Sequence, residues 1–338
     1  MRPKIAVIAD DFTGALDCST PFVLAGLSVV AATRPERVGR ALAANADVVV
    51  VNTASRALPP GVAADLTGIA AAALGGVDIA FKKIDSRLKG NVLAEVEAAA
   101  VAFGRDRIVV APAIPDQDRP TIAGAVTGRG VPVPLPIAPH VPEHAVIVDA
   151  TSDADLDELV AAEDWSGTLA VGARGLGLAL ARRYGDSRPQ PFVPSSRTLF
   201  AIGSHDPLTL AQLEHLRGAV SWHDAPLGAH AGDLASLPAL LRSTGPFAGP
   251  NVEISERFAR AVLAAVDARA PDTLVLSGGD TALAVLDALG IGVVRPLGEA
   301  APGLPWFLIE RPARPALRCI VKSGGFGGAD TLVNLLPK

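Results

Sequence analysis

The chain has 338 residues, of which 49% are hydrophobic and only 4% aromatic, with 33 glycines and 28 prolines. This length favours two domains over one, and the composition is typical of α/β enzymes with aliphatic interiors. The formal net charge of -5 leaves no basic stripe for a nucleic-acid partner, although a small anionic ligand would need only a local basic cluster.

The two cysteines, Cys18 and Cys319, lie at opposite ends of the chain and show no metal-ligand spacing. Free thiols in a reducing compartment are therefore expected. The apolar run at residues 4–9 is followed by two aspartates, too early for a signal peptide or a membrane span. We expect a cytoplasmic protein that has no membrane partner.

Short β-branched runs alternate with Ala- and Leu-rich helical stretches through the first half of the chain. The expected strands are 4–9, 28–33, 47–52, 78–84, 107–111 and 145–149. The proline-rich stretch 128–143 is predicted to be a surface loop. This order predicts βαβ units and a largely parallel sheet with right-handed crossovers.

A segment with three prolines, residues 187–194, interrupts the pattern and is the best linker candidate. Beyond it the expected strands are 198–202, 273–276, 292–295, 306–309 and 317–321. The fold class predicted is α/β with two domains, each with a largely parallel sheet flanked by helices. Their expected bounds are 1–190 and 197–338.

Candidate functional residues gather at four junctions where a strand ends and a helix begins, because open parallel sheets bind ligands at the carboxyl ends of strands. At the first junction Asp10 and Asp11 follow the opening strand, and Asp17 lies about two turns further along. Adjacent carboxylates can hold a metal ion or take a proton from a substrate hydroxyl. The alternative is that one of them only caps the helix.

The second junction runs from Lys83 to Asn91. Strand alternation predicts that Lys83 and Asp85 share one side, and Asn91 is expected to cap the next helix. Arg87 and Lys89 concentrate positive charge beside the helix N-terminus, which suits a carboxylate or a phosphate. A solvated charged turn is the alternative.

The third and fourth junctions are glycine loops, at residues 277–281 and 322–328, and a helix is expected from about residue 329. Glycines let the backbone amides approach a phosphate, and Asp280 could coordinate Mg2+. A tight turn with positive φ is the alternative. Neither loop matches GxxxxGK[ST] or a complete GxGxxG, which disfavours a P-loop enzyme and a standard NAD dehydrogenase.

Five separated motifs, in order, resemble the four-carbon acid sugar kinase family, which includes 3-oxo-tetronate, D-threonate and D-erythronate kinases. They are residues 10–17, 83–91, 111–115 with 119–121, 277–281 and 322–327. The resemblance spans nearly the whole chain. It implies an ATP- and Mg2+-dependent kinase whose N-terminal domain binds a sugar acid and whose C-terminal domain binds ATP, with catalysis in the cleft between them.

The resemblance also implies roles for individual residues. The catalytic residues would be Asp10, Asp11 and Arg87. The substrate-binding residues would be Asp17, Lys83, Asp85, Ser86, Lys89 and Asn91. The ATP-binding residues would be Ser204, Gly278, Gly279, Asp280, Thr281 and Gly324, with Asp280 as the Mg2+ ligand. The sequence does not choose between Asp11 and Asp10 as the proton acceptor.

The chain departs from the family pattern in three places. Gly325 replaces an Asn in the motif Ser-Gly-Asn-Phe-Gly, and His205-Asp206-Pro207 follows Ser204 where small residues are expected. The chain is also shorter than typical members, with the stretch 128–143 standing where more substrate-domain sequence is expected.

Three other functions remain open from the sequence. They are a non-catalytic nucleotide-binding sensor on the same fold, a kinase for a different small hydroxy acid, and a dehydrogenase with an atypical cofactor loop. A homodimer is the default oligomer for such an enzyme.

Overall fold

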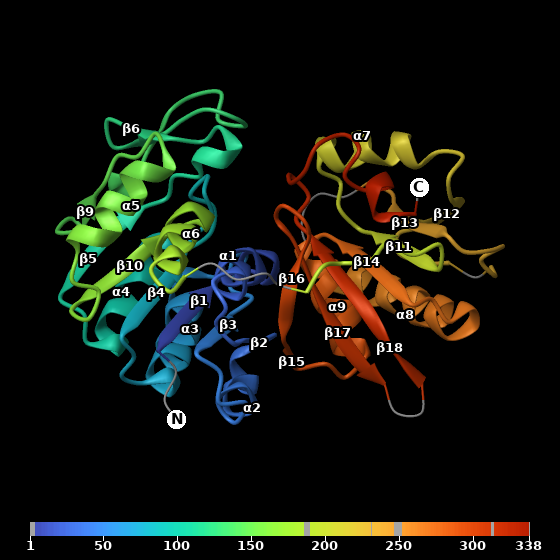
Figure 1. Cartoon of the computed structure of the whole chain (residues 1–338), viewed down its shortest axis with the longest axis horizontal. Helices are drawn as coiled ribbons and strands as arrows, with labels where there is room; N and C mark the ends of the chain where they lie inside the picture. The colour runs from blue at the N-terminus through green and yellow to red at the C-terminus, as the bar shows by residue number, and fades with distance from the viewer. Residues whose placement is uncertain (1–3, 186–189, 231, 247–251, 312–313, 338) are drawn as a thin grey trace. The chain divides into compact units, whose positions relative to one another are not determined.

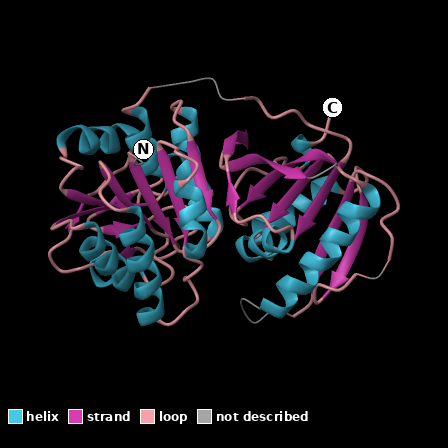
Figure 2. Ribbon diagram, turned by 90° about the horizontal axis from the view of Figure 1, so that it is seen from below, coloured by secondary structure: helices cyan, strands magenta, loops and turns pink. Residues whose placement is uncertain are grey.

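The computed structural model describes residues 4–185, 190–230, 232–246, 252–311 and 314–337 (Figures 1 and 2). The chain divides into two compact units, Met1–Pro189 and Gln190–Lys338. Part of the expected linker, residues 187–189, lies outside the described residues, and residues 190–196 form neither helix nor strand.

The first unit is built on a parallel sheet whose strands run in the order β2-β3-β1-β4-β10-β5-β9. Nearly every residue of these strands is buried, as expected for a parallel sheet covered on both faces. The strands are β1 (Ile5–Ala9), β2 (Val29–Ala32), β3 (Val48–Asn52), β4 (Ile79–Lys83), β5 (Arg107–Ala111), β9 (Val146–Ile147) and β10 (Thr168–Gly172).

Helices of the first unit form two groups. The six helices among its described residues are α1 (Phe12–Leu24), α2 (Val38–Leu42), α3 (Pro60–Leu74), α4 (Val92–Phe103), α5 (Asp153–Ala162) and α6 (Arg174–Arg182). Helix α6 packs against α1 and α5, whereas α3 packs against α2 and α4 (Figure 1). The chain leaves β1 towards one edge of the sheet and β4 towards the other, so right-handed crossovers put these groups on opposite faces. The strand order therefore reverses between β1 and β4, the point where such sheets bind ligands.

A small antiparallel sheet follows β5, with the order β6-β7-β8. Its strands are β6 (Thr121–Ile122), β7 (Ala125–Val126) and β8 (Leu135–Pro136), and the 3-10 helices η2 (Pro115–Gln117) and η3 (Ala138–His140) lie on either side. The prediction of a plain loop at 128–143 is therefore wrong in part. Strands of two residues are too short to produce a readable alternation of polar and apolar residues.

The second unit is also built on a largely parallel sheet. Its strands run in the order β12-β13-β11-β14-β18-β17-β16, and the pairing is parallel as far as β18 and antiparallel beyond it. The reversal point lies between β11 and β14. The strands are β11 (Thr198–Ile202), β12 (Ser221–Pro226), β13 (Ala239–Thr244), β14 (Thr273–Ser277), β15 (Val293–Val294), β16 (Pro296–Ala301), β17 (Leu304–Arg311) and β18 (Arg314–Lys322).

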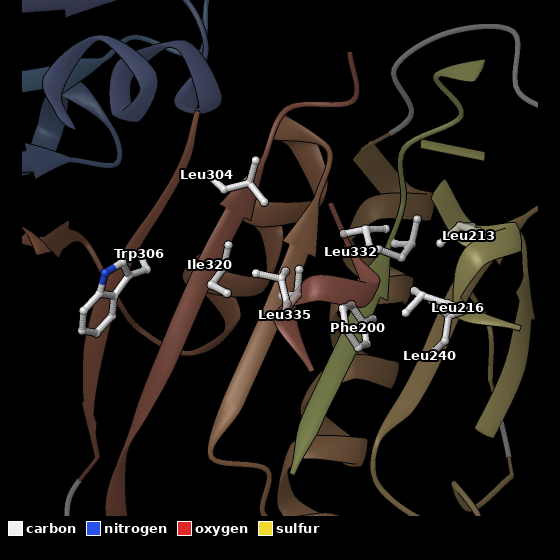
Figure 3. Packing of buried hydrophobic residues seen from close by; sticks show 11 residues of the cluster. Phe200, Leu213, Leu216, Leu240, Leu304, Trp306, Ile320, Leu332 and Leu335 are labelled. Atoms are coloured by element: carbon white, nitrogen blue, oxygen red, sulfur yellow. The ribbon is translucent and has the colours of Figure 1, made fainter. Parts of the chain in front are cut away.

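The helices of the second unit are α7 (Pro207–Leu216), α8 (Val252–Arg269) and α9 (Gly279–Ala288), and α8 packs against α9. Figure 3 shows a core cluster in which Leu213 and Leu216 of α7 and Leu332 and Leu335 gather near Phe200 of β11. The helix expected from residue 329 is absent, and a 3-10 helix, η4 (Val333–Leu335), takes its place. Leu332 and Leu335 are three residues apart, which suits the 3-10 repeat.

The predicted α/β class with two largely parallel sheets flanked by helices is confirmed. In the described part of the chain no helix combines the length and apolar character needed to cross a bilayer.

Candidate active site

One arginine joins the carboxylates at the carboxyl ends of β1 and β4. Arg56 Nε donates to Asp10 Oδ2 at 2.7 Å, and Nη2 donates to Asp10 Oδ1 and Asp11 Oδ1, both at 2.8 Å. Arg56 Nη1 lies 3.8 Å from Asp85 Oδ2. The structure thus brings together three of the predicted residues, Asp10, Asp11 and Asp85, around a guanidinium that the sequence analysis missed.

The two adjacent aspartates differ in their surroundings. Asp10 is 2% exposed; burial raises its pKa, but the charge and hydrogen bonds of Arg56 outweigh that effect and hold the pKa below its usual value. Asp11 caps α1, because its Oδ1 accepts from Gly14 N at 3.0 Å, and Thr13 Oγ1 donates to its Oδ2 at 2.5 Å. The side chain of Asp11 is 18% exposed, so it is the more accessible of the pair.

The loop after β3 holds Arg56 in place. Ser55 N donates to Asp10 O at 3.0 Å, and the Ser55 hydroxyl donates to buried Glu95 of α4. Glu95 also forms an ion pair of 2.9 Å with Lys82, whose side chain is fully buried in β4. The sequence marks Arg56 only by its position after a predicted strand end, since Arg56 belongs to no recognisable motif.

Two glycines allow the carboxylates their positions. A methyl group on Gly14 would collide with Asp11 Oδ1, and one on Gly90 would stand 2.8 Å from Asp10 Oδ2. Gly90 also has φ of +90°, which disfavours any other residue. The backbone itself therefore approaches the carboxylate cluster closely.

The turn after β4 is ordered by Asp85, whose Oδ1 accepts from Arg87 N at 2.9 Å and from Lys89 N at 3.5 Å. Strand β4 ends at Lys83, so the strand alternation used for the prediction does not reach Asp85. Lys83 is buried and donates to Ile84 O at 2.9 Å, whereas Lys89 is exposed.

The prediction that the Asn91 side chain caps α4 is wrong, although Asn91 occupies the N-cap position. Its Nδ2 donates instead to Leu58 O at 2.9 Å and Ser55 O at 3.2 Å. The amide thereby ties α4 to the loop that carries Arg56, because satisfying carbonyls in that loop competes with the helix cap.

Asp17 lies further along α1 and is engaged by another missed residue. Its Oδ1 is 3.1 Å from Arg174 Nη1, and both side chains are buried. Arg174 also lies 3.7 Å from Asp116. Arg174 begins α6 directly after β10, a strand that was not predicted.

The predicted nucleotide residues of the second unit come together at the ends of three adjacent strands. Ser204 N donates to Ser277 O at 3.1 Å, and Gly278 N donates to Lys322 O at 3.1 Å. A methyl group on Gly324 would stand 2.5 Å from Ser204 Oγ, and one on Gly278 would stand 3.3 Å from Ser204 N. Gly278 has φ of +105°, so the tight-turn alternative describes its backbone correctly.

The other predicted residues here begin α9, where Gly279 is the first helical residue. Thr281 is buried beside Gly203, where an added methyl group would collide with the Thr281 side chain. Asp280 is exposed in the first turn of α9. Asp206 caps α7, with its Oδ1 accepting from Leu208 N at 2.9 Å, and Pro207 opens that helix. The His-Asp-Pro sequence after Ser204 is thus explained by a helix start.

A buried lysine supports the last glycine loop. Lys322 Nζ donates to Ser323 O and Gly324 O, each at 3.0 Å, and to Thr209 Oγ1 at 2.9 Å. Burial lowers the pKa of Lys322 to about 8. Gln212 Nε2 donates to Phe326 O at 3.0 Å and to Gly328 O at 2.8 Å, and Thr209 Oγ1 donates to Gly324 O at 2.8 Å, so three side chains hold the loop carbonyls.

The donors for magnesium are sparse. In the described ranges no group of three or more His, Cys, Asp or Glu residues could hold a metal ion. Mg2+ in nucleotide sites is usually bound by one or two carboxylates together with phosphates and waters. Asp280 therefore fits a Mg2+ that arrives with a nucleotide.

Family models match both units. The model described as a sugar-binding N-terminal domain matches residues 5–142, and the one described as a nucleotide-binding C-terminal domain matches residues 228–332. Among solved structures, a putative tRNA synthase from Salmonella typhimurium LT2 matches with a TM-score of 0.74 at 19% identity over 98% of each chain. That likeness supports the fold alone.

Curated relatives align over almost the full chain. The D-threonate kinase of Bordetella bronchiseptica is 30% identical over 98% of this chain and 96% of its own length. The 3-oxo-tetronate kinase of Methylobacterium radiotolerans is 28% identical over 98% of each. The alignment with the Bordetella relative spans 394 positions against 338 residues here, so that relative has segments this chain lacks. The chain belongs to the four-carbon acid sugar kinase family.

Proposed function

We propose that this protein is an ATP-dependent kinase that phosphorylates a hydroxyl group of a four-carbon acid sugar, a tetronate or a 3-oxo-tetronate, in cytoplasmic carbohydrate catabolism. The observation that carries the proposal is the pairing of two sites on one chain. A carboxylate and guanidinium cluster lies at the reversal point of one sheet, and closely packed glycine loops lie at that of the other. The names of the curated relatives supply the substrate class.

In this reaction the acceptor hydroxyl oxygen forms a bond to the γ-phosphorus of ATP while the bond from phosphorus to the ADP oxygen breaks. The hydroxyl proton passes to a carboxylate, for which Asp11 suits better than Asp10. Asp10 is buried and bound twice by Arg56, whereas Asp11 is partly exposed. Backbone amides around Gly278, Gly279 and Gly324 would bind phosphate oxygens.

Asp280 would hold Mg2+ beside those phosphates, and the ion when bound would neutralise part of their charge. The cationic side chains of the first unit, Arg87 and Lys89, would attract the acid. Both units are thus required, since one binds the acceptor and the other binds the donor.

The test is an assay of purified protein with ATP, Mg2+ and a panel of tetronic and 3-oxo-tetronic acids, measuring ADP release and the phosphorylated acid. We expect turnover on at least one acid. Asp11→Asn should lower kcat by about a hundredfold or more, because the amide cannot accept the proton. Its affinity for ATP should stay within about threefold, since Asp11 belongs to the acceptor side.

Asp65→Asn is the matched control, because Asp65 is an exposed aspartate on α3, and its kcat should remain near that of the unaltered chain. ATP binding without turnover on any hydroxy acid would instead favour the sensor. Turnover confined to acids of another chain length would retain the kinase and replace its substrate. Loss of ATP binding in Asp11→Asn would mean that the two sides are assigned wrongly.

A further inference from the structure

Three arginines gather beside the turn after β4. Arg87 lies in that turn, and Arg119 and Arg129 belong to the segment between η2 and β8. Arg119 Nη1 donates to Ser86 Oγ at 2.7 Å, and its Nε donates to Arg129 O at 3.0 Å. The Arg119 guanidinium is thus fixed between two segments that are more than thirty residues apart in the sequence.

Among the described residues, the guanidinium groups of this cluster have no carboxylate at ion-pair distance. Arg119 is only 9% exposed, and neither it nor Arg87 forms an ion pair with a carboxylate in the described part of the chain. Burial lowers the pKa of Arg119, and the charge of Arg87 lowers it further, while Asp85 offsets part of the effect. A buried cation without a counter-charge is destabilising, so an anionic ligand would stabilise this arrangement.

The arginine side chains face a common space. A methyl group on Gly130 would stand 3.6 Å from Arg119 Nη2 and 3.9 Å from Arg87 Nη1, so both guanidinium groups border that position. Charge-assisted hydrogen bonds from nitrogen to a carboxylate are about 2.7–2.9 Å long, and a planar carboxylate can accept from two guanidinium groups at once. Glycine at position 130 leaves this space open.

The cluster adjoins the carboxylates around Arg56. Asp85 connects the two groups, because it lies 3.8 Å from Arg56 Nη1 and accepts from the backbone of Arg87. The arginine cluster and the carboxylates around Arg56 are thus neighbours at the same edge of the sheet.

We propose that Arg119 and Arg87 bind the carboxylate of the acceptor, and that Arg119 makes the site selective for acids over the corresponding sugar alcohols. This rests on the proposed function and adds a specificity-determining residue to it. Ser86, predicted to bind substrate, acts here by orienting Arg119.

The experiment compares D-threonate with D-threitol, the alcohol that has the same carbon chain but no carboxylate. We expect Arg119→Met to raise KM for D-threonate by about tenfold or more with a smaller change in kcat, because a charge-assisted contact made in the ground state is lost. Its kcat/KM for D-threitol should stay within about threefold of the unaltered chain, because the alcohol makes no such contact. Arg87→Met, at a half-buried position, should shift the preference in the same direction.

Arg107→Met is the matched control. Arg107 is an exposed arginine at the amino end of β5, paired with Glu163, and its loss should leave the acid preference unchanged. Calorimetric titration of D-threonate without nucleotide gives a second readout that does not depend on turnover, and thermal unfolding verifies that each variant folds.

The outcomes separate the two proposals. If the unaltered chain phosphorylates D-threonate but Arg119→Met and Arg87→Met lose acid and alcohol activity equally, the carboxylate role is overturned and the kinase stands. If D-threonate binds through Arg119 but neither it nor any other acid of the panel is phosphorylated, the carboxylate role stands and the kinase falls. If no tetronate is bound and none is phosphorylated, both proposals are overturned.

Discussion

Two neighbouring glycines, Gly324 and Gly325, have different surroundings at the end of β18. A methyl group on Gly324 would stand 2.5 Å from Ser204 Oγ and 2.7 Å from Asp206 Cβ, whereas one on Gly325 would make an ordinary contact of 3.5 Å with Asp206 Oδ2. Neither residue has positive φ, so the difference between them is steric. Only Gly324 is required by close packing of the loop against Ser204.

Gly324→Ala should therefore weaken the binding of ADP by about tenfold or more, which corresponds to roughly 1.4 kcal/mol. The added methyl group forces the loop away from Ser204 and redirects its amides. Gly325→Ala, the matched control, should stay within about twofold, and titration calorimetry measures both. Equal losses in the two variants would show that the loop depends on flexibility rather than on close approach.

At the residue scale, the sequence predicted candidate site residues that directly follow a strand. It failed for residues whose contacting side chains come from distant parts of the chain. Asp10, Asp11 and Gly278 were identifiable because strand ends mark the ligand edge of a parallel sheet. Arg56 was not, and Arg119 was quoted only as part of a family motif with no role, because the contacts of each come from side chains more than thirty residues away. Asn91 was assigned a cap from its position, and tertiary contacts redirected its side chain.

The elements predicted best are the buried strands with uninterrupted aliphatic runs. Strands β1, β3, β5 and β11 lie where the β-branched runs indicated, whereas β10, β12, β13 and β16 were missed. Strand β12 opens with the polar and aromatic residues Ser221, Trp222 and His223, and β16 contains Pro296 and Gly298. Such strands follow from pairing with neighbours, and local propensity does not reveal them.

The buried pair of Lys82 on β4 and Glu95 on α4 joins these two elements to the loop after β3. Lys82→Met alone should lower the free energy of unfolding by about 3–5 kcal/mol, because it leaves the Glu95 carboxylate buried without a counter-charge. Lys82→Met with Glu95→Gln should recover most of that stability and keep a hydrogen-bond partner for Ser55. Denaturant unfolding measures the free energies.

A second double variant separates loop positioning from packing. Lys82→Met with Glu95→Leu fills the same space but removes the partner of Ser55, so its stability should recover while kcat falls by about tenfold as Arg56 loses its support. The role assigned to Glu95 is wrong if both double variants keep full kcat.

At the scale of the whole molecule, the two units share one plan, with the candidate functional residues at the reversal point of each sheet. Because each unit has its own core, each should give its own unfolding transition. A ligand that binds one unit should stabilise that unit. One titrating group gives the second unit a distinctive pH response.

Lys322 has a folded pKa of about 8 against a reference of 10.5, so it binds its proton less tightly in the folded chain than in the unfolded one. Below pH 8 both states are protonated and the full cost of burying the charge is present. Between about pH 8 and 10.5 the folded state has released the proton that the unfolded state still holds, so stability rises with pH by up to about 3 kcal/mol.

Denaturant unfolding from pH 7 to 10.5, compared between the unaltered chain and Lys322→Met, isolates this contribution. The variant should lack the rise in its second-unit transition. Identical pH profiles for the two proteins would contradict the assigned burial of the ammonium group.

The Arg119 guanidinium, which forms no ion pair with any described carboxylate, has a consequence in the cell. An acid that binds there stabilises the folded chain by mass action, and a chain that unfolds less often is cleaved less often by proteases. The protein should therefore survive longer when its substrate is abundant and turn over faster when the substrate is exhausted. Abundance would then follow the supply of that acid through protein lifetime, without any change in gene expression.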